Sequence, residues 1–597
     1  MPTVSGLTFQ DFNSNGTRDL TAVVTGPSGS TVSAAVDRGI AAVTVTAFDA
    51  AGVNRGTAVT DAVGAYTLTV SGAQTDPLRI EFTTLPTGFT SGPRGVDSGT
   101  SVQFVPNGNQ TNVNFGVIRP VDHSQDNPLV ATSVYAFGDQ QSAANASKKT
   151  IVVFPYSSGG TNTAGFVNPN PAAPLFSVPA SQVGTTLGLG YGKGARDLYA
   201  SAYFKRFAGF GPDGTGAIYK IPVPATPTVG DTPPAGSLLY ADLNAIFGAN
   251  TAGVNLHDIS ATPNFDTDNG NTGWAAVGTS SLGGLDVSSD GQFIFVMNLA
   301  DRQLYRVPTT GAVNSTTVLR VSIPLGNPDS AVITPARFVS DDLRPFAVEY
   351  HDGKVYVGVV YSAQTKSTGA GDQTARDELL AAVYVLDPAA MTLTAAPVFT
   401  TRLNYTRSQS IYVGTSNWEP WSPTFFSTSR GSVGIAPQPM LSGITFDAQG
   451  NLTLGVRDRG ADQNGFFTFS DPAQPETRIE GFTGGDTLRA TVNTVDDLGS
   501  GWTLESNSRV PNNITASPAT LGNGPQGNNA GPGGGEFYYQ DNLGTTHAET
   551  SIGGTAQVPG SPNVLTTAMD PGDQTRAGGV SFFNTLTGAK DIRVPPQ

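Results

Sequence analysis

One stretch near the N-terminus carries the residue types that bind a hard cation: Asp11-Phe12-Asn13-Ser14-Asn15-Gly16-Thr17-Arg18-Asp19. Side-chain oxygens stand at alternate positions, a glycine permits a tight turn, and the backbone carbonyl of Thr17 follows. Oxygen ligands at this spacing suit Ca2+, whereas Mg2+ keeps its waters and fits less well. The stretch therefore predicts a calcium site formed by Asp11, Asn13, Asn15, Thr17 and Asp19. The alternative is an ordinary turn, because Asp, Asn and Gly are also the residues of tight turns.

Short alternating segments surround this stretch and must hold it in place. They are Ala42 to Phe48, Ala65 to Val70, Leu78 to Phe82 and Val113 to Val117, with Gly-rich or Asp-rich turns between them. Regular short strands separated by turns are typical of a β-sandwich. Residues 1–118 are thus predicted to form a small sandwich domain.

The order of motifs in this domain is specific. GLTFQDFNSNGTRD, DRGIAAVTVTAFDAAG, TDAVGAYTLTV and a closing VNFGV follow one another over about the first fifth of the chain. Together they resemble the calcium-binding B-type repeat of Gram-positive surface proteins, the SdrD B-like domain. The resemblance implies an immunoglobulin-like fold and a structural Ca2+.

The resemblance also suggests one more ligand. Ala22 stands at the twelfth loop position, where an acidic residue is usual, and Asp37-Arg38-Gly39-Ile40 occupies the place of the family's Glu-Pro-Gly-Leu-like segment after an insertion. Asp37 is therefore predicted as the replacement ligand. Asp61 and Asp49 are further candidates to complete the shell.

The larger part of the chain repeats a different unit. In residues 281–308, SLGGLDVSSDGQFIFVMNLADRQLYRVP, apolar alternation is broken by an Asp290-Gly291 turn, which is the signature of an antiparallel hairpin. Similar hairpins occur at 190–204, 346–360 and 444–456. Repeated short antiparallel sheets predict a β-propeller over residues 129–597, with about six or seven irregular blades. A β-helix is the competing fold.

Residues 119–128, rich in polar residues and bracketed by prolines, are predicted to be a linker with an exposed His123.

Three polar clusters fall where these strands end. They are Lys205-Arg206, then Arg457-Asp458-Arg459 with Asp462-Gln463, and finally Glu536 to Asp541 with His547 and Glu549. A hydrolase would recruit Asp458, Asp462, Glu536 and His547 as a metal or acid/base group. The structural interpretation, in which Arg and Asp pair between blades, is favoured, and no catalytic residue is assigned. Trp418 and Trp421 are predicted to anchor a loop against a blade, although exposed aromatics can also stack on sugars.

Composition excludes several classes of function. The net charge of −15 opposes binding to nucleic acids and to anionic membrane surfaces. There is no cysteine, which rules out disulfides, thiolate catalysis and Cys-based zinc sites. No segment approaches the length of a membrane span, so direct membrane insertion is not expected. A chain of 597 residues, poor in charge and rich in turn formers, predicts an all-β protein of two or more domains.

These features lead to one functional expectation and two alternatives. Phrases such as RDLYASAYFKRFAGFGPDGTGAIYKI resemble large extracellular bacterial proteins in which a B-type repeat precedes a propeller-like region. We expect a secreted or cell-surface structural or adhesive protein whose partners are glycans or other surface proteins. The alternatives are a propeller hydrolase or lyase acting on extracellular glycans or esters, and a self-assembling surface-layer or filament subunit.

Overall fold

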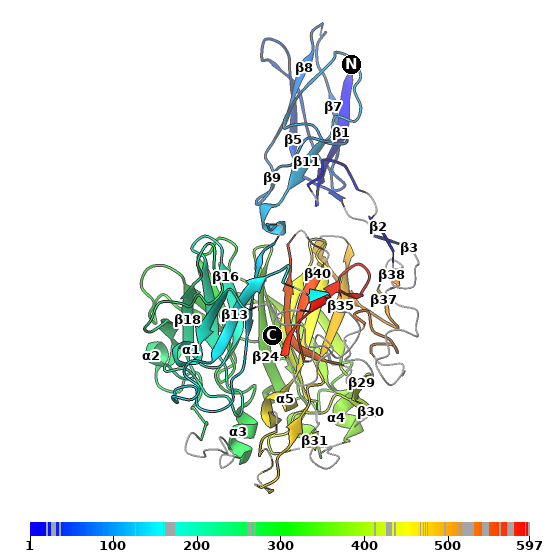
Figure 1. Ribbon diagram of the computed structural model, residues 1–597. Helices are drawn as coiled ribbons and strands as arrows, with labels where there is room; N and C mark the ends of the chain where they lie inside the picture. Colours follow the sequence, from blue (N-terminus) through cyan, green and yellow to red (C-terminus); the bar gives the residue numbers. More distant parts are fainter. Residues whose placement is uncertain are drawn as a thin grey trace.

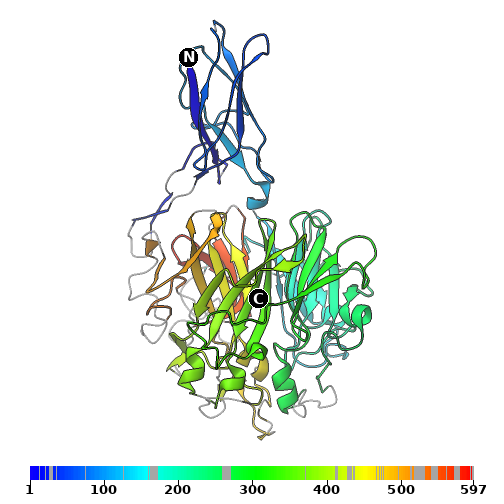
Figure 2. The ribbon, with the colours of Figure 1, turned by 180° about the vertical axis from the view of Figure 1, so that it is seen from behind.

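The protein is described here by a computed structural model, in which two bodies follow one another along the chain (Figure 1). The description covers residues 1–594 except 13, 20, 21, 26–30, 35, 36, 74, 126, 159, 162–172, 259–265, 267–269, 370, 411–413, 426–432, 435, 436, 466, 470, 472, 475, 495, 496, 511–513, 516–530, 540–548, 560, 562, 570–577 and 592. The N-terminal body stands above a larger ring of sheets, and Figure 2 shows the same arrangement from behind.

The N-terminal body is a β-sandwich of two sheets. One sheet has the order β4 (Arg38–Gly39), β1 (Thr3–Gln10), β11 (Phe115–Ile118), β9 (Thr90–Ser91), with β7 (Ala65–Thr69) also paired to β1. The other has the order β10 (Val102–Val105), β8 (Leu78–Thr83), β5 (Thr44–Phe48), β6 (Asn54–Val59). The predicted immunoglobulin-like sandwich is therefore confirmed as a fold.

Alternation of side chains explains the core of this sandwich. In β8, Leu78, Ile80 and Phe82 point inward and are buried, while the residues between them are half-buried. Successive side chains of a strand face opposite sides, so one face of each sheet can be apolar. Tyr66 and Phe115 pack against Phe82, with ring centroids 5.8 and 5.0 Å away.

The larger body is built from six sheets, which we number as blades 1 to 6. Blade 1 is β12 (Leu129–Ser133), β13 (Lys149–Pro155), β15 (Phe176–Pro179); blade 2 is β16 (Thr186–Gly192), β17 (Asp197–Ala202), β18 (Ala217–Pro222), β19 (Leu239–Asp242); blade 3 is β20 (Leu282–Val287), β21 (Phe293–Asn298), β22 (Gln303–Pro308), β23 (Leu319–Ser322). Blade 4 is β24 (Leu343–His351), β25 (Lys354–Tyr361), β26 (Leu380–Asp387), with β27 (Thr392–Leu393) and β28 (Phe399–Arg402) on β26; blade 5 is β32 (Pro439–Phe446), β33 (Leu452–Asp458), β35 (Asp486–Thr494), β36 (Asp497–Leu504); blade 6 is β39 (Ser551–Gln557), β40 (Asn563–Met569), β41 (Gly578–Asn584), β42 (Lys590–Asp591).

The six blades close into a ring. The first strands of blades 1 to 6 contact one another in sequence order, from β12 to β39. Blade 6 returns to blade 1, where Asn563 Nδ2 donates to the Tyr156 hydroxyl at 2.5 Å and Tyr156 packs on Phe582. In addition, β43 (Arg593–Val594) pairs with β14 (Gly160–Thr161). The predicted β-propeller is confirmed, and its described residues form six blades.

The predicted hairpins are the first two strands of blades 2 to 5. In blade 3, the Gly291 amide donates to the Ser288 carbonyl at 2.8 Å, and Gly291 has a φ of +71° that favours glycine. The second strands are buried on both faces, and every residue of β33 is buried. This differs from a sheet with one solvated face, because a neighbouring blade covers each side.

Glycines in the first strands let neighbouring blades approach each other. A Cβ on Gly284 of β20 would lie 2.7 Å from the Phe346 carbonyl oxygen, and one on Gly443 of β32 would lie 2.5 Å from the Gly553 oxygen. At the same level, the pairing of the first and second strands shifts register in blades 2 to 6, as at a β-bulge. Close packing at the axis thus explains the glycines of the repeated unit.

The remaining elements are short. The helices are α1 (Ala180–Val183), α2 (Leu243–Phe247), α3 (Gly270–Ala276), α4 (Gln373–Asp377) and α5 (Arg459–Asn464), with 3-10 turns η1 (Pro120–Asp122), η2 (Ser340–Asp342) and η3 (Gln364–Lys366). Small two-stranded pairs are β2 (Ala22–Thr25) with β3 (Thr31–Ala34), β29 (Thr406–Ser410) with β30 (Gly414–Asn417), β31 (Val433–Gly434) with β34 (Glu480–Gly481), and β37 (Arg509–Val510) with β38 (Ile514–Thr515). Among the described residues, no helix is both long and apolar enough to span a membrane.

We predict that Gly284→Ala lowers the denaturation midpoint of the propeller, by roughly 1–3 kcal/mol in unfolding free energy, because the new methyl meets backbone atoms of the next blade. Gly326→Ala is the matched control, since a Cβ there has no atom within 4 Å. Urea unfolding followed by tryptophan fluorescence measures both. Equal midpoints for the two variants would contradict close blade contact at Gly284.

Candidate functional site

A short buried helix, α5, brings together polar residues from distant parts of the propeller. It begins directly after β33, where the Asp458 side chain caps it by accepting from the Gly460 amide at 2.7 Å. It ends at Gly465, whose φ of +65° suits glycine. Between these ends, every residue of α5 except Ala461 is buried.

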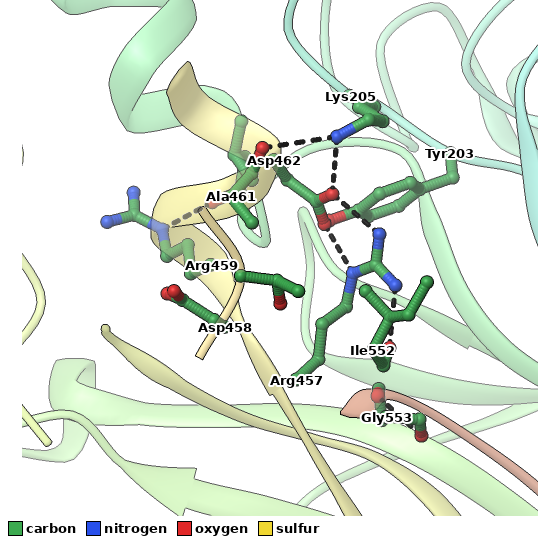
Figure 3. Close-up of polar contacts among 12 residues, drawn as sticks. Tyr203, Lys205, Arg457, Asp458, Arg459, Ala461, Asp462, Ile552 and Gly553 are labelled. Carbon is green, nitrogen blue, oxygen red and sulfur yellow. Dashed lines mark hydrogen bonds and ion pairs between the residues drawn. The ribbon is translucent and has the colours of Figure 1, made fainter. Parts of the chain in front are cut away.

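Asp462 lies at the centre of a network of donors (Figure 3). Arg457 forms a bidentate ion pair with the Asp462 carboxylate, with Nε 2.5 Å from Oδ2 and Nη2 2.6 Å from Oδ1. Lys205 Nζ donates to Oδ1 at 2.7 Å, and the Tyr203 hydroxyl donates to Oδ2 at 2.9 Å. Arg457 Nη1 also donates to the Ile552 carbonyl at 2.7 Å. The network therefore joins blades 2, 5 and 6.

The charges in this network set its protonation. Burial favours the neutral acid, but the charges of Arg457 and Lys205 hold the pKa of Asp462 well below its usual value. Burial lowers the pKa of Lys205, and Asp462 opposes that change. Burial raises the pKa of Tyr203 well above its usual value, and the Asp462 charge adds to the effect. The carboxylate is thus an ionised bridge, with both of its oxygens engaged.

Helix α5 crosses the axis of the ring. It follows β33 of blade 5 and contacts Tyr203 to Arg206 after β17 of blade 2, and these two blades are opposite because three steps separate them in either direction around six. It lies at the end of the propeller away from the sandwich (Figure 1).

Arg459 fixes the other side of α5 through bonds to backbone and side-chain amide oxygens. Its guanidinium donates to the Val277 carbonyl at 2.8 Å, the Gln438 side-chain oxygen at 2.7 Å and the Ser422 carbonyl at 3.0 Å. It also lies over the Trp421 ring, 4.3 Å from the centroid. A planar donor fork on several carbonyl oxygens positions the helix rather than a ligand.

The four residues of the hydrolase alternative lie in different surroundings. Asp458 accepts from the backbone amides of Gln438, Gly460 and Gly484, whereas Asp462 faces Arg457 and Lys205. Burial raises the pKa of Asp458 to about 6, against these backbone bonds. Glu536 belongs to a separate group of carboxylates, and His547 lies outside the described residues. The structure brings together the first two predicted clusters as a blade-to-blade contact.

Trp418 and Trp421 are both in the core. They are 0% and 1% exposed, and Trp421 Nε1 donates to the Pro439 carbonyl at 2.8 Å. Between them, buried Glu419 forms an ion pair with Arg376. The predicted anchor is confirmed, and these two indoles present no face for sugar stacking.

The predicted calcium loop has its acidic side chains turned inward. Asp11 is fully buried, and its two oxygens accept from the amides of Asn15 at 3.1 Å and Gly16 at 2.7 Å. Asp37 accepts from the amides of Phe12 at 3.1 Å and Asp19 at 2.8 Å, and so bridges both ends of the loop. The segment inserted before Asp37 contains the β2–β3 hairpin.

Like charges gather in this loop. Burial raises the pKa of Asp37 to about 6, against its backbone bonds, and the carboxylates of Asp11 and Asp19 raise it further. Asn15 lies in the same turn, where its Oδ1 accepts from the Thr17 amide at 2.6 Å and its Nδ2 donates to Asp19. A divalent cation would offset this charge, and carboxylate and amide oxygens are ligand types that calcium accepts. Asn13 lies outside the described residues.

Two of the sequence candidates lie elsewhere, and one neighbour was missed. Asp49 and Asp61 accept from amides of their own turns, at Ala51 and Val53 and at Val63 and Ala65. Asp97 does contact the loop: its Oδ2 accepts from the Arg18 amide at 3.0 Å, and its amide donates to the Gly16 carbonyl. No local motif around residue 97 indicates this role, because only folding brings it to the loop.

The predicted linker is ordered by contacts with both bodies. Arg119 forms an ion pair with Asp352 of blade 4 at 2.5 Å, and Gln10 donates to Asp122 of η1 at 3.0 Å. His123 is half-buried, with Nε2 3.5 Å from the Ser14 hydroxyl of the predicted calcium loop. The expectation of an exposed His123 was wrong, because the loop packs against it.

Comparison with curated proteins finds colossins of Dictyostelium discoideum. The chain is 27% identical to colossin-A over 485 residues, which is 79% of this chain and 4% of that protein. It is 26% identical to colossin-B over 533 residues, which is 86% of this chain and 12% of that protein. The chain spans between 4% and 36% of the length of the four colossins that it matches. No family model matches the sequence.

Solved structures give distant matches. A Bacteroides uniformis structure provisionally described as a 6-phosphogluconolactonase matches with a TM-score of 0.30 and 11% identity, covering 79% of this chain and 98% of that chain. A family AA12 carbohydrate-active enzyme of Trichoderma reesei matches with a TM-score of 0.29 and 9% identity, covering 73% and 87%. The likeness concerns the fold alone, and the strand pairing described above establishes the propeller independently.

We predict that Asp462→Asn destabilises the propeller by about 3–5 kcal/mol, because it leaves Arg457 and Lys205 buried without their counter-charge. Since the folded pKa of Asp462 lies below the unfolded value of 3.8, its contribution is present above that pH and is lost as the pH falls below it. Thermal unfolding of both proteins between pH 7 and pH 2 measures the difference, which should shrink in acid.

Asp387→Asn is the control for this prediction. Asp387 pairs with Lys354 on the surface, where both side chains are more than 40% exposed, so its loss should matter little. Similar melting curves for the Asp462 and Asp387 variants would show that the network does not hold α5 in place.

Proposed function

We propose that this chain is an extracellular structural or adhesive protein, in which a calcium-stabilised sandwich is joined to a propeller that serves as a scaffold for interactions. The observation that carries the proposal is that the polar residues around α5 bond to one another and to the backbone. Asp458 caps α5 and Asp462 binds Arg457 and Lys205, so two of the four groups that the hydrolase alternative would recruit are engaged in holding α5. Recognition would then fall to loops on the rigid ring.

The calcium part of the proposal rests on the loop at the domain junction. Asp11, Asp19 and Asp37 lie close enough for their charges to affect one another, and the loop contacts His123 of the segment that leads to the propeller. A bound cation would offset the repulsion between these carboxylates. It would also stiffen the loop against the junction.

The colossin matches agree with a modular role. A stretch that occupies 4% of colossin-A and 12% of colossin-B is one part of a much longer polypeptide. Structural and adhesive proteins are commonly assembled from such parts. A bacterial origin and a surface location remain part of the proposal.

We predict that Asp11→Ala removes a calcium-dependent rise in the melting temperature of the sandwich. Binding to the folded state alone adds about 2.7 kcal/mol when calcium is at a hundred times its Kd. Differential scanning calorimetry of the full chain, in calcium and in chelator, measures the rise. Asp76→Ala, at an exposed position of the same domain, should keep it. A wild-type chain that melts identically in calcium and in chelator would refute the loop site.

The functional proposal is tested by measuring binding and turnover on the same preparation. The full chain is applied to arrays of glycans and extracellular proteins, and in parallel is incubated with glycoside and ester substrates, with and without calcium. We expect saturable binding to at least one class without product formation. Metal-dependent turnover would instead support the hydrolase or lyase alternative, and ordered polymers on calcium addition would support the assembling subunit.

A further inference from the structure

Three acidic side chains from separate parts of the chain converge beside blade 5. Asp486 is the first residue of β35, Glu536 follows a glycine-rich loop, and Glu549 stands shortly before β39 of blade 6. They are 2%, 5% and 1% exposed, and one carboxylate oxygen from each lies within 4.8 Å of the other two. This group is distinct from the Asp462 network and from the calcium loop.

The spacing of the three oxygens suits a hard cation. Calcium binds oxygen ligands at about 2.3–2.6 Å, so ligands on opposite sides of the ion are roughly 4.6–5.2 Å apart, and adjacent ligands are closer. Separations of up to 4.8 Å therefore fit around one ion. Buried carboxylates are costly unless a positive charge or protons offset them.

A buried arginine provides a second, independent observation. Arg407 of β29 is fully buried, and its Nη1 donates to the Gly484 and Gly485 carbonyls, which immediately precede Asp486. Its guanidinium acts on Asp486, where it opposes the effect of burial on the carboxyl pKa. Nε and Nη2 of Arg407 have no hydrogen-bond acceptor among the described residues. This polar group beside the carboxylates thus retains donors for an acceptor that arrives with a ligand.

The glycine-rich loop is shaped around one of the acids. Gly531 has a φ of +90°, and a Cβ there would lie 2.5 Å from Cγ of Glu536. A side chain at Gly531 would therefore push Glu536 out of its place. On the other side, the Tyr405 hydroxyl donates to Oδ2 of Asp486. Packing against Gly531 therefore holds Glu536, and a hydrogen bond holds Asp486.

We propose that Asp486, Glu536 and Glu549 bind a divalent cation, with Ca2+ the best fit, and that the spare donors of Arg407 hold a water or small anion that shares the site. A divalent ion would offset the charge of carboxylates that converge in a buried position. The all-oxygen donor set excludes a preference for softer metals such as zinc.

Calcium content tests this proposal. The chain with Asp11→Ala, which lacks the loop site, is stripped with chelator, dialysed against calcium and analysed by mass spectrometry for bound metal. We expect about one ion per chain, lost on adding either Asp486→Asn or Glu549→Gln. Asp377→Asn, at an exposed position of α4, is the matched control and should keep the ion. No bound ion in the Asp11→Ala chain, or an ion that survives both substitutions, would overturn the proposal.

Terbium luminescence keeps the test decisive if a charge-neutralised variant fails to fold. Tb3+ replaces Ca2+ in oxygen sites and is sensitised by a nearby phenol, and Tyr405 bonds directly to Asp486. In the Asp11→Ala chain, we expect emission sensitised by the aromatic side chains beside the site, Tyr405 and the Trp418 ring against Arg407, and Ca2+ should compete it away. An Asp11→Ala chain without Ca2+-competitive emission would refute the site.

Discussion

The propeller depends on a carboxylate buried at its axis. Helix α5 crosses from blade 5 to blade 2 at the end of the ring away from the sandwich (Figure 1). Asp462 holds that crossing because its carboxylate accepts from Arg457 of blade 5 and from Tyr203 and Lys205, which follow β17 of the opposite blade. A buried ion pair adds little net stability over an apolar contact, but it allows only one arrangement of its partners. It therefore fixes how the blades meet.

The same residue type has three different roles in this chain, and surroundings decide among them. The charges of an arginine and a lysine keep Asp462 ionised, whereas Asp458 accepts from backbone amides and caps helix α5. Asp486 instead lies with two other carboxylates and one arginine. Only the last arrangement gathers three carboxylates around one point. This contrast separates residues that build the scaffold from residues suited to a ligand.

Side-chain contacts also hold the sandwich and the propeller together at their junction. Arg119 bonds to Asp352 of blade 4, and His123 contacts Ser14 of the predicted calcium loop. The inserted hairpin reaches further, because β3 lies against β38 of the larger body (Figures 1 and 2). The proposed cation loop therefore sits where it can influence how the two bodies are held, rather than at a free tip of the sandwich.

Local patterns in the sequence determined the fold class, the sandwich strands and the blade hairpins, because alternation and Asp-Gly turns are properties of neighbouring residues. They also identified the loop containing Asp11 and the polar ends of β17 and β33. Tertiary structure alone decided that Lys205 meets Asp462, that Asp97 reaches the loop, and that Asp486 joins Glu536 and Glu549. These partners lie tens to hundreds of residues apart. Their meeting depends on how the ring closes, which no short-range pattern encodes.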